Sequence, residues 1–158
     1  MSYELKNIER LDEKRFSVGE VVLKEGDKGK DIYVLSVGEV SVSASGKEIC
    51  RVEGNNNFFG EISCFLDTEY SATIRAETEC VFYVIDDVET YLKVNPDAAL
   101  CFTKGLAERL VKMNEHFVEI KEELESIKES VDSSFKSRVN RLIEKMDSFW
   151  GKDVFPNK

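Results

Sequence analysis

A glycine followed by a short apolar segment is the part of this 158-residue sequence whose residue types best suit a chemical role. Gly60 precedes Glu61, Ile62 and Ser63, in a run that favours one short helical turn. The first N–H groups of such a turn have no partner within it, and their partial positive charge attracts an anion such as phosphate. A carboxylate beside them can accept hydrogen bonds from a sugar hydroxyl. The segment is therefore a candidate site for a small anionic ligand, although a Phe-Gly-Glu tripeptide alone has little specificity.

Residue types that support catalysis or bind metals are not grouped in this sequence. The cysteines, Cys50, Cys64, Cys80 and Cys101, are widely scattered and have no neighbouring histidine, so we expect reduced, buried thiols and no zinc or iron–sulfur site. His116, the single histidine, lies in a charged helical stretch and is expected at the surface. No nucleophile has a plausible base beside it. We therefore expect a non-enzymatic protein without catalytic residues, bound metal or cofactor.

The charge balance excludes several classes of partner. There are 31 acidic and 22 basic residues, which gives a net charge of −9 and argues against binding to DNA or to anionic membranes. The longest strongly apolar run, residues 81–85, is far shorter than the roughly 20 residues needed to cross a bilayer. Residues 1–6 lack the basic and apolar regions of a secretory signal, so we expect a cytoplasmic location.

Between Phe16 and Ile85 the sequence has short β-forming segments separated by turn residues about every 8 to 12 residues, as in antiparallel barrels and sandwiches. Gly46 lies between two alternating runs and predicts a hairpin. Residues 54–57 have the composition of a loop. The strands are expected at residues 21–23, 32–35, 40–44, 49–52, 71–76 and 80–85.

After Pro96 the apolar period changes from two to about three and a half residues, which predicts a long helix over residues 98–131. The apolar positions form the seam of a left-handed coiled coil: Leu106, Leu110, Met113, Phe117, Ile120, Leu124, Ile127 and Val131. The first half is expected to pack on the barrel. A helix of this length would extend about 50 Å, more than the barrel can cover, so we expect the distal seam to form a homodimer.

The seam loses its register after Val131, and residues 132–134 predict a break with a new helix N-cap. A second helix is expected to continue to Trp150, with Gly151 closing it. Residues 132–158 carry a net charge of +2, so we expect their basic face to meet the acidic part of the long helix. The predicted domains are residues 1–112, a barrel with flanking helices, residues 113–131, a coiled-coil dimerisation helix, and residues 132–158, a C-terminal helix and tail.

Four segments together carry a family resemblance. Residues 16–22 (FSVGEVV), 25–35 (EGDKGKDIYVL), 38–42 (GEVSV) and 59–76 (FGEISCFLDTEYSATIRA), read in order, resemble the cyclic nucleotide-binding domain. The resemblance covers the chain from about residue 10 to residue 110, with near-family spacing. It implies a mainly β fold with added helices: a jelly-roll barrel, or double-stranded β-helix, of eight strands with flanking helices and a phosphate-binding cassette between two strands. The implied ligand is cAMP or cGMP.

The family pattern also implies roles for individual residues. Glu61 would bind the ribose 2′-hydroxyl, and the N–H groups of Ile62 and Ser63 would face the cyclic phosphate. Ser71 falls at a second phosphate contact, Leu66 and Ala72 would line the pocket, and residues 106–113 would lie over the base. The ligand-binding residues implied by the resemblance are Gly60, Glu61, Ile62, Ser63, Tyr70, Ser71 and Ala72.

One departure from the family pattern concerns the phosphate-binding arginine, which falls on Tyr70 here. A phenol offers one donor and no charge, whereas a guanidinium offers a full charge and a fork of donors. Arg75 is five positions further on, and this odd spacing in a strand predicts that it faces the opposite side. The loss is expected to weaken phosphate binding by about 1.5 to 3 kcal/mol, or roughly ten- to a hundredfold. The approach to the cassette, residues 54–61, is also about two residues longer than is usual in the family.

Two functions stay open at this stage. The first is a non-enzymatic regulatory protein that senses a cyclic nucleotide or related small anion and signals through its C-terminal helix. The second is a degenerate barrel that binds no nucleotide and serves as a dimeric interaction or scaffold module for a protein partner of unknown identity. A transcription factor is not expected, because only 27 residues follow Val131 and a DNA-reading helix-turn-helix region would need roughly 60.

Overall fold

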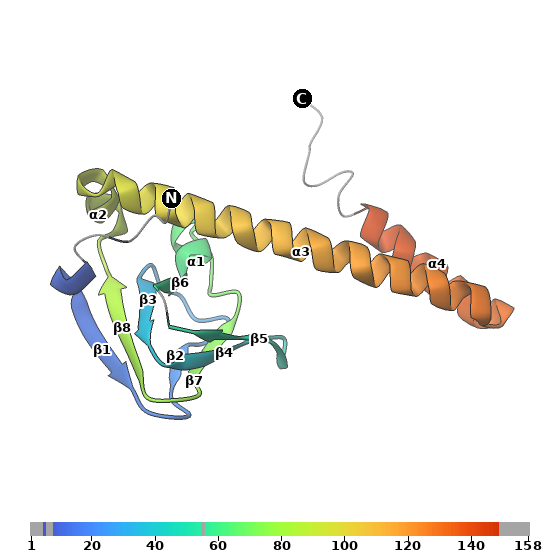
Figure 1. Ribbon diagram of the computed structural model, residues 1–158, viewed down its shortest axis with the longest axis horizontal. Coiled ribbons are helices and arrows are strands. Elements are labelled where there is room, and N and C mark those ends of the chain that lie inside the picture. Colours follow the sequence, from blue (N-terminus) through green and yellow to red (C-terminus); the bar gives the residue numbers. More distant parts are fainter. Residues whose placement is uncertain (1–4, 6–7, 55, 149–158) are drawn as a thin grey trace. The chain divides into compact units, whose positions relative to one another are not determined.

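The computed structural model describes residue 5, residues 8–54 and residues 56–148. In that part of the chain, eight strands form two four-stranded antiparallel sheets, with orders β1-β8-β3-β6 and β2-β7-β4-β5 (Figure 1). The strands are β1 (Asp12–Phe16), β2 (Val21–Leu23), β3 (Ile32–Val37), β4 (Glu39–Ala44), β5 (Lys47–Glu53), β6 (Asn57–Phe59), β7 (Thr73–Ala76) and β8 (Cys80–Ile85). The helices are a 3₁₀ turn at Ile8–Arg10, α1 (Glu61–Leu66), α2 (Val88–Val94), α3 (Pro96–Ser130) and α4 (Ser133–Ser148). The predicted jelly-roll class, with a long helix and a short last helix after the barrel, is confirmed.

Contacts divide the chain into two compact units, Met1–Lys104 and Gly105–Lys158. The first, the barrel unit, contains both sheets, α1, α2 and the start of α3. The second, the helical unit, contains the rest of α3 together with α4. Each unit is described by itself below, and the domain boundaries expected from the sequence remain predictions.

The core of the barrel unit is centred on Phe82 of β8, which is fully buried. Its ring meets three other rings edge-on, those of Phe16 (centroids 5.6 Å apart), Tyr33 (6.1 Å) and Phe59 (6.4 Å). These rings come from β1, β3 and β6, so the cluster joins all four strands of one sheet. Burial of each aromatic side chain contributes on the order of 1.5 to 3 kcal/mol to folding.

Two strands were not predicted, β1 and β6. The first four residues of β1 are charged and exposed, since β1 is an edge strand that pairs only with β8, and no apolar alternation marks it. Strand β6 begins at Asn57, which the composition of residues 54–57 assigns to a loop, and its two phenylalanines pair with β3. Helix α2 was also not predicted; the Asp87 side chain caps it by accepting a hydrogen bond from the Thr90 amide at 3.1 Å.

The strand expected at residues 71–76 begins two residues later, at Thr73. Tyr70 and Ser71 therefore belong to the loop between α1 and β7 and not to a strand. In the strand proper, Ile74 and Ala76 are buried while Arg75 faces solvent. The alternation expected for β7 is confirmed, but it does not extend back to Tyr70.

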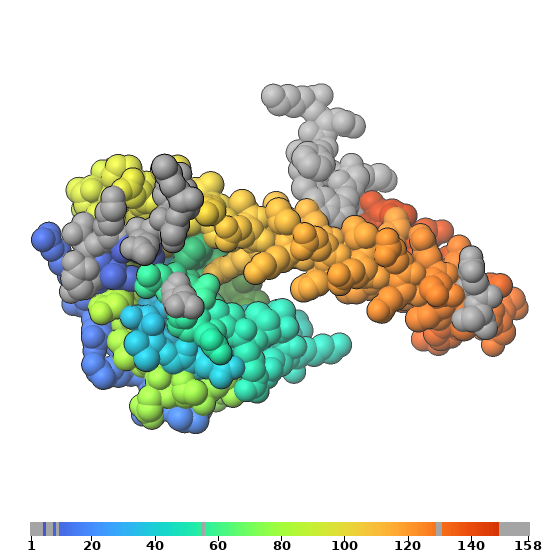
Figure 2. Space-filling view, viewed as in Figure 1, coloured from blue at the N-terminus to red at the C-terminus, as the bar shows by residue number. Residues whose placement is uncertain are grey.

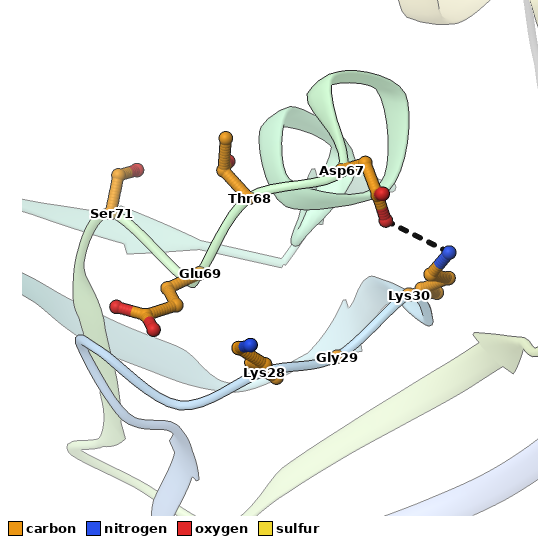
Figure 3. A pocket seen from close by; sticks show the side chains of 7 residues that line it. All are labelled: Lys28, Gly29, Lys30, Asp67, Thr68, Glu69 and Ser71. Carbon is orange, nitrogen blue, oxygen red and sulfur yellow. Dashed lines mark ion pairs between the residues drawn. The ribbon is translucent and has the colours of Figure 1, made fainter.

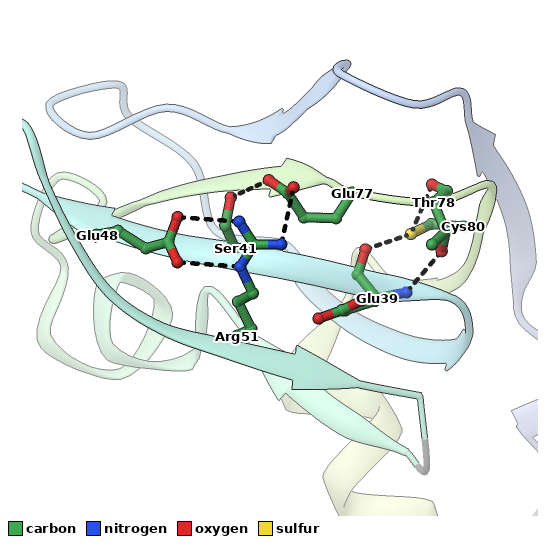
Figure 4. A network of polar contacts seen from close by, with 7 residues as sticks. All are labelled: Glu39, Ser41, Glu48, Arg51, Glu77, Thr78 and Cys80. Carbon is green, nitrogen blue, oxygen red and sulfur yellow. Dashed lines mark hydrogen bonds and ion pairs between the residues drawn. The ribbon is translucent and has the colours of Figure 1, made fainter.

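A polar network on the second sheet connects β4, β5 and the turn after β7 (Figure 4). The buried Ser41 hydroxyl donates to the Glu77 carboxylate at 2.7 Å, which satisfies the only polar group that β4 buries. The same carboxylate forms an ion pair with Arg51 at 3.3 Å, and Arg51 also binds Glu48 at 3.0 Å. Because the arginine is half exposed, these pairs orient the hairpin more than they stabilise it.

The cysteines do not share one environment. Cys80 is buried, Cys64 and Cys101 are partly buried, and Cys50 is exposed. Burial was predicted for all four, and for Cys50 this was wrong because its strand, β5, lies at a sheet edge with almost every residue exposed. Among the described residues, no group of three or more candidate ligands could hold a metal ion. The exposure predicted for His116 is confirmed.

In the helical unit, α4 (red) runs back along the distal part of α3 (orange; Figures 1 and 2). The break predicted at residues 132–134 is confirmed: the Asp132 carboxylate accepts hydrogen bonds from the Ser134 amide at 2.9 Å and the Phe135 amide at 3.0 Å. The predicted contact between the helices is also present, but its ion pair has the opposite polarity, since Lys121 of α3 binds Asp147 of α4 at 2.7 Å. The predicted helix end at Trp150 and Gly151 lies outside the described residues.

Of the helices that the structure describes, none combines the length and the apolar character needed to span a lipid bilayer. The cytoplasmic location remains a prediction.

We predict that Asp132→Ala destabilises α4 by about 1 kcal/mol, because two amides at the helix start lose their acceptor. Hydrogen exchange of the α4 amides measures this directly and should show faster exchange in this variant. Asp132→Asn keeps an acceptor oxygen in the same place and serves as the control. Equal protection in Asp132→Ala and the native chain would contradict the cap.

Candidate functional site

Helix α1 starts at a position that only glycine can occupy. Gly60 is its N-cap, with φ 89° and ψ −6°, in the left-handed region that side chains disfavour. A Cβ on Gly60 would also lie 2.5 Å from the carbonyl oxygen of Asp31. This close approach turns the chain from β6 into α1 and directs Glu61 and Ser63 inward, where each is only 2% exposed. Ile62, between them, is 42% exposed.

The other end of α1 is tied to the loop between β2 and β3. Asp67 adopts the left-handed conformation, with φ 53°, and its amide donates to the carbonyl of Ser63. The Asp67 carboxylate forms an ion pair with Lys30 at 2.8 Å. The ion pair favours the charged form of both side chains. The hydrogen bond with Lys30 lowers the pKa of the Asp67 carboxyl, and the hydrogen bond with Asp67 raises the pKa of the Lys30 amine. Both side chains are exposed, so the pair adds little stability.

The backbone of Tyr70 is fixed by the same β2–β3 loop. The Tyr70 amide donates to the carbonyl of Asp27 at 2.9 Å, and the Gly26 amide donates to the carbonyl of Tyr70 at 2.9 Å. An isolated bridge between Lys28 and Glu69 continues this pairing. Tyr70 is therefore held by two backbone hydrogen bonds although it lies outside any strand.

The side chain of Tyr70 is part of the barrel core. It is 9% exposed and belongs to the cluster that contains Leu23, Tyr33 and Phe59. Its ring lies against two glycines: a Cβ on Gly29 would overlap the Tyr70 hydroxyl, and a Cβ on Gly60 would lie 3.4 Å from the ring. The phenol thus lies beside the start of α1.

Burial, with smaller contributions from Tyr33 and Asp31, raises the pKa of Tyr70 to about 12. At neutral pH the ring beside Gly60 is therefore an uncharged phenol. A guanidinium at this position would have brought a positive charge to the first turn of α1. The electrostatics of the site thus differ from those of a phosphate site built with arginine.

The predicted ligand-binding residues fall into two groups. Gly60, Glu61, Ser63 and Tyr70 lie at or beside the start of α1, on the core side. Ile62 and Ser71 are exposed, and Ala72 is half-buried. The pocket residue expected at Leu66 is 68% exposed.

Ser71 lines an open groove of about 860 Å³ between the β2–β3 loop and the segment after α1 (Figure 3). The other residues that line it are Lys28, Gly29, Lys30, Asp67, Thr68 and Glu69. Arg75 does not reach this region as a replacement for the missing arginine, because its guanidinium donates to the carbonyl of Gly19 at 2.6 Å. Both signs of charge line the groove, so it has no strong preference for an anion.

Three residues of this region were not predicted from the sequence, and the first is Gly29. The sequence offered a signal, since Gly29 lies in the glycine-containing run of residues 25–35, but the need for a glycine arises only from the Tyr70 ring that packs on it. Lys30 and Asp67 were also missed, because nothing in their spacing indicates that two loops approach each other.

Comparison with protein families gives a match to the cyclic nucleotide-binding domain over residues 13–91, which is half of the chain. The chain belongs to the cyclic nucleotide-binding domain family. The match contains every strand of the barrel unit but β1's first residue, together with α1 and the loop that holds Tyr70.

A curated relative and several solved structures extend this finding. The chain is 43% identical over 68 residues to a cGMP-dependent protein kinase of Eimeria tenella, but the match spans only 7% of that kinase. It is similar in fold to the catabolite activator protein of Thermus thermophilus (TM-score 0.63, 19% identity, 72% of this chain and 56% of that one).

Two further structures of similar fold come from kinase regulatory subunits. One is a structure of Sp-2Cl-cAMPS bound to PKAR CBD2 (TM-score 0.53, 24% identity, 66% of this chain and 72% of that one). The other is a structure of cAMP-bound PfPKA-R (TM-score 0.56, 24% identity, 66% and 36%). At these identities the likeness shows the fold alone.

We predict that Gly29→Ala destabilises the barrel by about 1 to 3 kcal/mol, because the new methyl group overlaps the Tyr70 hydroxyl. In a Tyr70→Leu background the shorter side chain leaves room, so the same substitution should cost less. Urea denaturation of the two single variants and the double variant measures the coupling. Additive effects would show that the ring does not lie against Gly29.

We predict that Tyr70 weakens the native fold at high pH. Its pKa of about 12 in the folded protein exceeds the ordinary value of 10.0, so the folded chain keeps a proton that the unfolded chain loses between these values. The contribution is complete below about pH 10 and is lost as the pH rises toward 12. Urea denaturation from about pH 9 to pH 11.5 should show a steeper fall for the native chain than for Tyr70→Phe, which has no phenolic proton. Parallel curves would contradict a buried phenol.

Proposed function

We propose that this chain is a non-enzymatic regulatory module of the cyclic nucleotide-binding domain family whose barrel does not bind a cyclic nucleotide at micromolar concentration. Its working part is the helical unit, which serves as an assembly and interaction surface. The observation that carries this proposal is the buried, neutral Tyr70 ring beside the start of α1.

The energetics support the absence of tight binding. A cyclic phosphate carries a full negative charge, and a buried anion needs either an opposite charge or several strong donors. The phenol supplies no charge, and it must stay protonated in its apolar surroundings. A charge-assisted hydrogen bond is typically stronger than a neutral one by about 1 to 2 kcal/mol, so its loss alone weakens a complex roughly five- to thirtyfold. A buried phosphate left without its counter-charge costs about 1 to 3 kcal/mol more, and the two effects together move a micromolar complex well toward the millimolar range.

The second candidate function is a sensor of a cyclic nucleotide, and one observation favours it. Gly60 keeps the left-handed turn at the start of α1, and it is followed directly by Glu61, the residue to which the family pattern assigns the ribose, which is buried. The names of the similar proteins include a cGMP-dependent kinase and a cAMP-bound regulatory subunit, which indicates the ligand class to test.

We predict that isothermal titration calorimetry with cAMP and cGMP detects no saturable binding by the native chain at ligand concentrations up to about 1 mM. A dissociation constant of about 1 mM corresponds to a binding free energy of about −4 kcal/mol. The Tyr70→Arg variant should bind roughly ten to a hundred times more tightly than the native chain. Circular dichroism before each titration confirms that the variants keep the β-sheet signal.

Two matched variants make this experiment decisive. Thr68→Arg adds the same charge two residues away, on an exposed position outside the implied ligand-binding residues, and should gain nothing. Glu61→Gln in the Tyr70→Arg background should lower the regained affinity, since an acidic acceptor is lost. Saturable binding by the native chain that Glu61→Gln weakens would overturn the proposal and establish the sensor.

A further inference from the structure

Helix α3 carries an apolar ridge that α4 does not cover. Met113, Ile120 and Ile127 recur at intervals of seven residues and are 53%, 52% and 43% exposed. The α3 residues nearer to α4, Phe117, Lys121 and Leu124, are less exposed, and Lys121 forms the ion pair with Asp147. The ridge therefore lies beside the contact with α4 and not within it.

Helix α4 repeats this arrangement. Val139 is its buried contact residue, at 2% exposure, while Phe135 and Leu142, seven residues apart, are 44% and 50% exposed. Ile120 and Leu142 line one apolar groove of about 610 Å³, so the two ridges lie on the same side of the hairpin. Together, the ridges of α3 and α4 form a single face, which we call the hairpin face: Met113, Ile120, Ile127, Phe135 and Leu142.

A pair of helices can bury only the stripes that face each other. Here each helix has a second stripe at heptad spacing, which is the pattern of a helix that packs against two neighbours in a four-helix bundle. Large apolar side chains half exposed along one continuous face mark an interaction surface on a folded protein.

The borders of the hairpin face carry opposite charges on the two helices. On α3, Glu119 and Glu123 border the ridge at Ile120, one position before it and three after it. On α4, Arg138 and Lys145 flank Leu142, four positions before it and three after it. All four charged side chains are exposed, so the α3 edge of the face is acidic beside Ile120, and the α4 edge is basic beside Leu142. One heptad earlier on the α3 edge, beside Met113, the exposed residue is Lys112.

We infer that the hairpin face binds the hairpin face of a second copy of this chain and forms a four-helix bundle, with α3 of one copy beside α4 of the other. The acidic edge of each copy then meets the basic edge of the other copy. This contact occurs twice, because a two-fold axis parallel to the helices relates the copies. A stacking of α3 on α3 would bring like charges together and is disfavoured. This inference rests on the proposed assembly role and deepens it: the dimer uses both helices, where the sequence predicted a coiled coil of the long helix alone.

Sedimentation equilibrium on the full chain tests the inference. The native chain should be dimeric at micromolar concentration. Ile120→Glu and Leu142→Glu should each raise the dissociation constant at least about tenfold, since each places a charge in an apolar contact. Val118→Glu is the matched control: Val118 is 52% exposed on the same helix, but about 200° around it from Ile120, and should leave the dimer unchanged.

Charge reversal tests the arrangement. Glu119→Lys with Glu123→Lys should weaken the dimer, and so should Arg138→Glu with Lys145→Glu, because each pair makes both edges the same sign. All four substitutions together exchange the signs and should restore it. Helicity measured by circular dichroism separates dissociation from unfolding in every variant.

A monomeric native chain, or a dimer that Leu142→Glu and the α4 reversal leave intact, would overturn the inference. The second result would assign the dimer to α3 alone. Sedimentation equilibrium measures the mass of the assembly, whereas calorimetry measures the binding of the nucleotide. The inferred dimer and the proposed loss of nucleotide binding can therefore fail separately.

Discussion

The packing of Tyr70 between Gly29 and Gly60 is the constraint on which the rest of the site depends. It requires a glycine on each side, a β2–β3 loop held to the segment after α1 by backbone hydrogen bonds, and a left-handed turn at the start of α1. At the position where the family pattern has a charged arginine for the ligand, this chain has Tyr70, whose ring completes the core instead. The barrel gains apolar burial at this position, and the start of α1 loses an electrostatic partner for phosphate.

The replacement of a ligand-binding side chain by a packing side chain shows that the fold and the phosphate affinity of this family depend on different residues. The fold depends on alternating apolar residues and a few glycines, and these are all present. Phosphate affinity depends on one charged side chain, and a neutral phenol stands in its place. Membership of the family therefore shows the fold of the chain but does not show which ligand it binds.

The helical unit depends on a different constraint. Asp132 lies between α3 and α4 and caps α4, and the resulting hairpin covers part of the α3 seam. A seam that looks continuous in the sequence is thereby divided between an internal partner and an exposed face. The heptad period could not distinguish these, because it records only that apolar residues recur on one side of a helix.

The sequence alone predicted short antiparallel strands, the long helix, the break at residues 132–134 and the glycine turn before α1, because each follows from local periodicity or from backbone conformation. The choice of a jelly-roll barrel among antiparallel folds came from the family resemblance. It missed β1 and β6, whose residues are charged or follow an asparagine run, since sheet pairing and not propensity places them. The tertiary structure alone shows where the Tyr70 ring lies, that Gly29 must be a glycine, and that α3 and α4 pair through Lys121 and Asp147 with the polarity opposite to the expected one. These features join residues far apart in the chain, and no local pattern encodes such contacts.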